Sequence, residues 1–229
     1  MGRDPQSEVV RRVEPFRIAM DDAGATLDEQ ALALSSALQP GLDVLGALTE
    51  LDVLAGECPT PTRHGVMDFL FGGGAFAGDR SDYHRWQNSC LDHVLASRRG
   101  IPITLSVIGV EVARRLGVEL AGVGMPGHFL IGDPDDADWF VDPFRGTVGL
   151  DRESCRGILA QLGVAQWSEH FLDPTPHRQI IARMLNNLRR TCESRGDAVR
   201  LAIVMQARQV LPEFADERVE AQQALAVLN

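Results

Sequence analysis

The pattern of apolar and polar positions predicts that the first hundred residues are mainly helical. Apolar side chains recur at helical spacing in residues 27–38, 41–56 and 66–71, with prolines between these segments. The glycine-rich residues 71–79 interrupt the pattern. Because no predicted strand precedes them and no Gly-Lys-Ser/Thr follows, they indicate a flexible connector rather than a phosphate-binding loop.

Two further helices are predicted between residues 88 and 117. The first, in NSCLDHVLASRR, takes Ser89 as its N-cap and ends at Gly100. The second begins at Pro102, which suits a first helical turn, and ends at Gly117, which suits a helix exit. Its residues are apolar on nearly every face before the arginine pair, so we expect it to be the central buried helix.

From residue 118 to 150 the period changes to two. Short apolar segments bounded by Gly, Pro and Asp predict an antiparallel meander. Helical patterns return at 151–163 and then from 177 on, with breaks at Gly196 and Pro212. The predicted fold is therefore α+β, with helices around a small antiparallel sheet and a helical C-terminal tail. We divide the chain into an N-terminal helical segment, a core and a tail: 1–86, 87–172 and 173–229.

The meander contains a histidine and an aspartate whose placement can be predicted. A hairpin with its loop at residues 133–137 pairs Gly132 with Asp138, and the same register places His128 opposite Asp142. Directly opposed side chains lie close enough to hydrogen-bond. The other face of the hairpin would be apolar and buried, and a slip of one residue would separate the pair.

A carboxylate beside an imidazole is typical of a catalytic base, but the same pair can also serve as a structural hydrogen bond. It fixes the tautomer of the ring and presents the second nitrogen outward, which a general base requires. Alternatively, the hydrogen bond from His128 to Asp142 only holds the hairpin together. For an arbitrary sequence the structural role is the more common one.

Composition excludes several kinds of partner. The chain has 22 Lys and Arg against 32 Asp and Glu, a formal net charge of −10, which disfavours nucleic acid and anionic membranes. No signal peptide or long apolar segment is present, so we expect a cytoplasmic protein. Its four cysteines lack CxxC spacing and indicate free thiols in a reducing compartment.

The sequence offers no convincing site for a metal or a cofactor. Cys90 and His93 share a helix, but no second pair with ligand spacing follows. The acidic residues 133–138 lack the glycine and the terminal glutamate of an EF-hand, and they are typical of a solvated hairpin tip. We therefore predict no metal and no cofactor.

Several motifs together resemble the SirB family of bacterial proteins, which has a transglutaminase-like core. They are NSCL at 88–91, RRGIPITL at 98–105, PGHF at 126–129 and VDPF at 141–144. The segment before NSCL and the RMLNNLRR run in the tail are similar to the family as well. The resemblance implies a papain-like core followed by tetratricopeptide-like helices.

The wider transglutaminase-like superfamily uses a Cys, His, Asp triad, and this chain matches two of its members. The resemblance assigns the base to His128 and the orienting carboxylate to Asp142. The cysteine belongs at the start of the central helix, where this chain has Pro102, which carries no nucleophile. Thr104 in the same turn and Cys90 beside the preceding helix are the candidate substitutes.

Three hypotheses follow from these residues. The first is a pseudoenzyme that binds an unidentified protein or peptide at the inherited cleft. The second is an amide hydrolase or acyl-transferase in which Cys90 or Thr104 acts with His128 and Asp142. In the third, the core is only a scaffold and the C-terminal helices dock a helix or tail of a partner.

Overall fold

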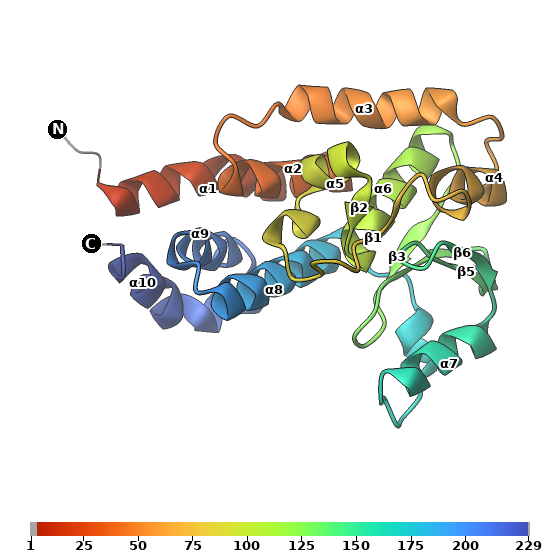
Figure 1. The fold of residues 1–229 in the computed structure, drawn as a ribbon. Coiled ribbons are helices and arrows are strands. Elements are labelled where there is room, and N and C mark those ends of the chain that lie inside the picture. Colours follow the sequence, from red (N-terminus) through yellow and green to blue (C-terminus); the bar gives the residue numbers. More distant parts are fainter. Residues whose placement is uncertain (1–3, 229) are drawn as a thin grey trace.

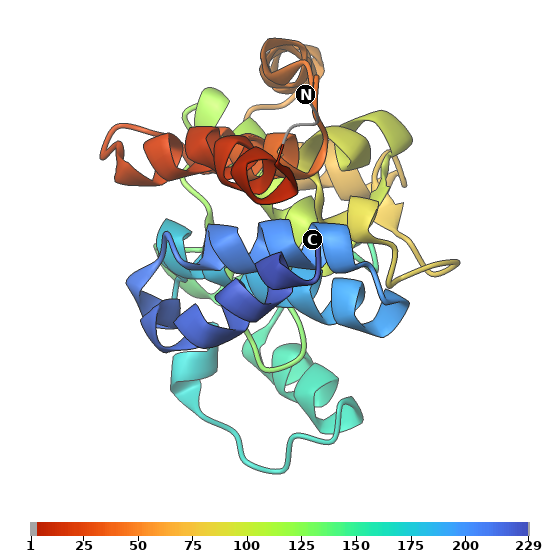
Figure 2. The same cartoon turned by 90° about the vertical axis from the view of Figure 1, so that its left-hand side faces the viewer.

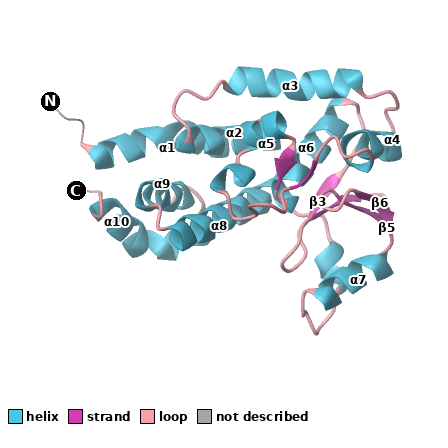
Figure 3. Cartoon of the chain, in the orientation of Figure 1, coloured by secondary structure: helices cyan, strands magenta, loops and turns pink. Residues whose placement is uncertain are grey.

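The computed structural model describes residues 4–228 and consists of helices with a small sheet at one end (Figure 1, Figure 3). The helices are α1 (Pro5–Asp21), α2 (Leu27–Leu38), α3 (Val44–Glu57), α4 (Arg63–Met67), α5 (Leu91–Ser97), α6 (Pro102–Arg115), α7 (Arg152–Gln161), α8 (His177–Arg195), α9 (Ala198–Arg208) and α10 (Arg218–Ala226). The strands are β1 (Ala77–Gly78), β2 (Arg99–Gly100), β3 (Ala121–Val123), β4 (Leu130–Asp133), β5 (Asp136–Asp142) and β6 (Thr147–Leu150). Residues 1–3 and 229, at the outer ends of the first and third predicted segments, lie outside the described part.

The helices predicted before residue 90 are present with small shifts at their ends. α2 has the predicted bounds and begins with a capping box between Thr26 and Glu29. α3 begins at Val44, after Asp43, whose side chain accepts from the amide of Gly46. The segment predicted at 66–71 is divided between α4 and a π-helical turn, Asp68–Gly72.

The predicted ends of α5 were wrong at both sides. Ser89 closes a 3₁₀ turn, Cys90 takes the N-cap position, and the amide of Leu91 donates to the Ser35 hydroxyl of α2 at 3.1 Å. The cap thus comes from another helix rather than from the neighbouring serine. At the other end Arg98 adopts a left-handed conformation, with φ of 58°, and the chain leaves the helix before Gly100 to form β2 beside β1.

The central helix is confirmed. Every residue of α6 from 102 to 113 is buried, Pro102 occupies its first turn, and Gly117 has a φ of +70° just beyond its end. Because the sides of the helix are buried in the core, a polar or open environment can reach it only at its two ends.

The meander is confirmed as a four-stranded antiparallel sheet in the order β3-β4-β5-β6, but the predicted register was wrong by two residues. A two-residue turn at 134–135 pairs Asp133 with Asp136, and a bulge that takes up extra residues of β5 then pairs Gly132 with Phe140 rather than with Asp138. A shift of two residues leaves every side chain on its predicted face.

Both faces of the sheet are buried, which corrects the expectation of one buried face. Ile131 and Val141 belong to the main core, which also contains the α6 side chains. Leu130 and Phe140 pack in a second cluster with Ile158 and other residues of α7. α7 lies apart from the other helices in Figure 1 because it covers this second face.

The tail forms three helices with breaks at Gly196 and Pro212, as predicted. Figure 2 shows these helices as a layer below α1 and α2. The main apolar cluster contains buried side chains from all three predicted segments, including Leu34, Leu105 and Leu185. None of the helices in the described part of the chain is both long and apolar enough to cross a membrane.

Candidate functional site

His128 and Asp142 are in direct contact. His128 Nε2 donates to Asp142 Oδ2 at 2.8 Å, and the exposed fractions of the two side chains are 9% and 0%. His128 lies two residues before β4, after a turn in which Gly127 has a φ of +70°, and Asp142 ends β5. Because the loop rather than the strand carries His128, the contact forms despite the shifted register.

The second oxygen of Asp142 is held by the backbone. Oδ1 accepts from the amides of Phe144 at 3.0 Å and Arg145 at 3.1 Å, and the Arg145 guanidinium lies 3.4 Å from Oδ2. A carboxylate fixed in this way holds the ring of His128 in one orientation. With its proton on Nε2, the neutral ring presents Nδ1 as an acceptor.

Arg183 of α8 holds the loop that carries His128. Its guanidinium donates to the carbonyls of Gly124 at 2.6 Å, Met125 at 2.8 Å and His128 at 2.9 Å, and it stacks over the ring of Phe129 at 5.1 Å. Burial lowers the pKa of this arginine from its ordinary value. The tail helix thus positions the histidine loop.

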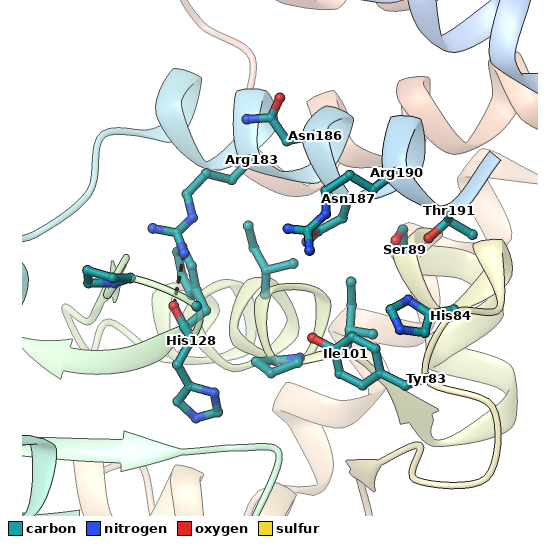
Figure 4. Close-up of a pocket in the computed structure, with 15 residues that line it drawn as sticks. Tyr83, His84, Ser89, Ile101, His128, Arg183, Asn186, Asn187, Arg190 and Thr191 are labelled. Atoms are coloured by element: carbon teal, nitrogen blue, oxygen red, sulfur yellow. Dashed lines mark hydrogen bonds between the residues drawn. The ribbon is translucent and has the colours of Figure 1, made fainter. Parts of the chain in front are cut away.

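A cavity of about 560 Å³ opens between α8, the start of α6 and this loop (Figure 4). Pro102 and His128 both line it. The segment before α5 contributes Tyr83, His84 and Ser89, and α8 contributes Arg183, Asn186, Asn187, Arg190 and Thr191.

Residues 23–186, most of the chain, match the sequence profile described as the transglutaminase-like superfamily. The chain belongs to the transglutaminase-like superfamily. It is 42% identical over 129 residues to a UPF0162 protein of Xylella fastidiosa, an alignment that covers 54% of this chain and 46% of that protein. A UPF0162 protein of Pseudomonas aeruginosa is 32% identical over 127 residues, covering 55% of this chain and 46% of that protein.

A eukaryotic protein is similar to part of the chain as well. F-box only protein 21 of Mus musculus is 46% identical over 122 residues, which cover 49% of this chain and 19% of that protein. The chain thus spans less than half the length of the bacterial relatives named above and a smaller share of the mouse protein. No solved structure matches it.

The position at which the resemblance places the superfamily's cysteine is the first residue of α6. Pro102 occupies it and faces the same cavity as His128. Ser89 and Thr191 add hydroxyls to the cavity, but Figure 4 places both at the end away from His128. Pro102 therefore supplies no nucleophile at the position that the resemblance assigns to the cysteine.

The two candidate substitutes are enclosed in the core. Thr104 is 0% exposed, and its hydroxyl has no hydrogen-bond partner among the described residues. Cys90 is also 0% exposed, and burial raises the pKa of its thiol far above the usual range. Neither residue lines the cavity. Both environments favour a packing role over nucleophilic attack.

The other thiols offer no better candidate. Burial raises the pKa of Cys155 and of Cys192 to about 12, and Cys58 is half-buried in the turn after α3. Within residues 4–228 no three His, Cys, Asp or Glu side chains are grouped so as to hold a metal ion.

Sequence reasoning missed the contribution of α8. Arg183, Asn187 and Arg190 recur at i, i+4 and i+7, so they form a polar stripe along one face of the helix. That spacing is a signal in the sequence. It shows that one face of the helix is polar, but it does not show which segment lies opposite.

Proposed function

We propose that this protein is a SirB-type member of the transglutaminase-like superfamily that binds a segment of another protein, or a peptide, without acyl transfer. The observation that supports this proposal best is the joint position of Pro102 and His128 in one cavity. A thiol hydrolase or acyl-transferase needs a nucleophile there, and proline supplies none.

The size of the cavity supports the binding role. A volume of about 560 Å³ is within the range of ordinary ligand sites, and its lining combines apolar side chains with amides, hydroxyls and cations. The tail, which we take to be tetratricopeptide-like, contributes one wall of it through α8. We further propose that core and tail form one binding unit, with His128 and Asp142 retained to hold the loop between them.

The test combines an assay for chemistry with an assay for binding. Peptides that contain glutamine and lysine are incubated with the wild type and with His128→Ala, and ammonia release, amine incorporation and cleavage are measured. We expect no turnover by either protein. Turnover that is lost in His128→Ala would contradict the proposal.

Binding is tested with an immobilised protein and a random heptapeptide library. Asn187 lines the cavity, and its side chain makes no hydrogen bond within the described residues, so Asn187→Trp fills the cleft without breaking a hydrogen bond. Gln179→Trp is the matched control, because Gln179 is exposed on the same helix and does not line the cavity. We expect selected peptides to bind the wild type and Gln179→Trp but not Asn187→Trp.

A further inference from the structure

The charge of the cavity is opposite to that of the chain. The protein carries 32 acidic residues against 22 Lys and Arg, yet the described residues that line the cavity include no aspartate or glutamate. Two arginines, Arg183 and Arg190, line it. In a protein of formal net charge −10, a cleft with this lining is a local site of positive charge.

Of the two arginines, Arg190 is the one whose guanidinium is free. Arg183 is already bonded to three backbone carbonyls. Arg190 is exposed and makes no ion pair or hydrogen bond within residues 4–228. Figure 4 shows its side chain extending from α8 into the cavity, on the side of Tyr83 and His84.

The neighbouring Arg189, which lies outside the cavity, differs from Arg190 because it has ion-pair partners. Arg189 is paired with Glu193 at 2.8 Å and with Glu217 at 3.1 Å. Across the cavity, burial raises the pKa of Tyr83 and the positive charge of Arg190 opposes that rise. The Arg190 charge therefore acts on the interior of the cleft rather than on a neighbouring carboxylate.

We infer that the segment bound in the cleft carries a carboxylate, which pairs with Arg190. A guanidinium binds a carboxylate through two parallel hydrogen bonds, and the amide of Asn187 beside it offers a further donor. This inference rests on the proposed peptide-binding function and adds the chemistry of the ligand. Because the formal net charge of the chain is −10, an acidic peptide is not attracted by the protein as a whole, and the cations of the cleft have to supply the attraction locally.

The experiment uses the heptapeptide library with free and with amidated C-termini. Peptides selected on the wild type are sequenced, and their affinities are measured by fluorescence anisotropy at fixed salt. We expect enrichment of Asp and Glu, or dependence on the free C-terminus. Asp→Asn or Glu→Gln changes identify side chains as the source of the carboxylate, and loss on amidation identifies the chain end.

Variants of the protein test whether Arg190 is the positive charge that binds the carboxylate. Arg190→Gln should weaken binding by about 10- to 100-fold, the effect of losing hydrogen bonds to a charged group, and Arg190→Lys should weaken it less. Arg218→Gln removes an exposed cation that lies outside the cavity and makes no ion pair in the described chain, so it should leave affinity unchanged.

The possible failures are distinguishable. If neutral peptides bind as tightly as acidic ones, or Arg190→Gln binds like the wild type, while Asn187→Trp still abolishes binding, the carboxylate inference is wrong and the proposed function stands. If no selected peptide is blocked by Asn187→Trp, the proposed function itself fails.

Discussion

The two ends of α6 are surrounded by charge in opposite ways. At the C-terminal end Arg114 and Arg115 lie among Asp28, Asp52 and Glu111, and every one of these groups has an opposite charge within 4.0 Å. At the N-terminal end Pro102 opens into a cavity whose lining, over the described residues, contains cations and no carboxylate. One buried helix thus connects a closed ionic cluster to an open cleft.

The difference separates a structural arrangement from one suited to a ligand. Asp28 and Glu111 are fully buried, and burial of an unpaired charge costs several kcal/mol, so the arginines that pair with them offset this cost in the folded state. Arg190 at the other end satisfies no charge of its own chain in the described residues. A ligand can therefore take its charge without breaking a contact that stabilises the fold.

The largest expected effect on stability is at the C-terminal end of α6, where the charges are paired. Arg115 lies 2.6 Å from Asp28, 3.2 Å from Glu111 and 2.7 Å from Asp52, and its side chain is 13% exposed. Arg115→Ala should lower the free energy of unfolding by about 3–5 kcal/mol, because buried Asp28 loses its main partner and Glu111 keeps only Arg114, at 2.7 Å. Urea denaturation measures the change, and Arg218→Ala, an exposed control, should stay within about 0.5 kcal/mol. A loss for Arg115→Ala as small as that of the control would show that the cluster is not needed for folding.

A smaller loss of stability is expected for Arg183→Ala, at the N-terminal end of α6, where the cavity lies. This change removes the donors to three carbonyls of the loop that carries His128, and should cost about 2–3 kcal/mol. The NMR signals of the His128 ring should change as well, because the ring loses its fixed contact with Asp142. Arg183→Lys should restore part of the stability. An unaltered His128 signal in Arg183→Ala would mean that the loop is held without the arginine.

Much of this comparison could be predicted from sequence. Residues 102–117 are apolar on nearly every face and lie between a proline and a glycine, which indicated a buried helix and both of its ends. The contact between His128 and Asp142 was predicted through a register that is wrong by two residues. The contact forms because His128 lies in the loop before the strand, so its position does not depend on the strand register.

The remainder depends on packing between distant segments. Arg183 meets the carbonyl of His128 across 55 positions of sequence, and the amide of Leu91 meets Ser35 across 56. The polar stripe of α8 and the serine of α2 are visible in the sequence, but their partners are not. For the same reason the full burial of Cys90 could not be predicted from its place beside a helix start.

The pH dependence of stability tests the contribution of one carboxyl group, Glu111, at the C-terminal end of α6. Burial raises the pKa of Glu111 above its ordinary value of 4.5, and its Oε1 has no hydrogen-bond partner among the described residues. The folded state therefore binds more protons than the unfolded state above pH 4.5, so this group's contribution to stability is lost as the pH rises through the raised pKa. Glu111→Gln should flatten that fall in the free energy of unfolding, measured by urea denaturation from pH 4.5 upward. Glu119→Gln, on an exposed residue, should follow the wild type; a Glu111→Gln curve parallel to the wild type would exclude Glu111 as its source.

The smallest effect on stability is expected for Pro102→Cys, which places a thiol in the first turn of α6. A helix N-terminus favours the thiolate, and the cysteine would line the same cavity as His128. In a Cys58→Ser background the native thiols are buried, so alkylation by iodoacetamide at pH 7 should report the new cysteine. We expect a rate about 10-fold above that of an ordinary exposed thiol.

The role of His128 is separated by adding His128→Ala to this variant, which should slow alkylation while leaving the cysteine accessible. A cysteine at 102 that reacts no faster than the Cys58→Ser background would place the residue outside the cleft. The argument that proline stands where a nucleophile is needed would then fail, although the cavity and its free arginine would remain.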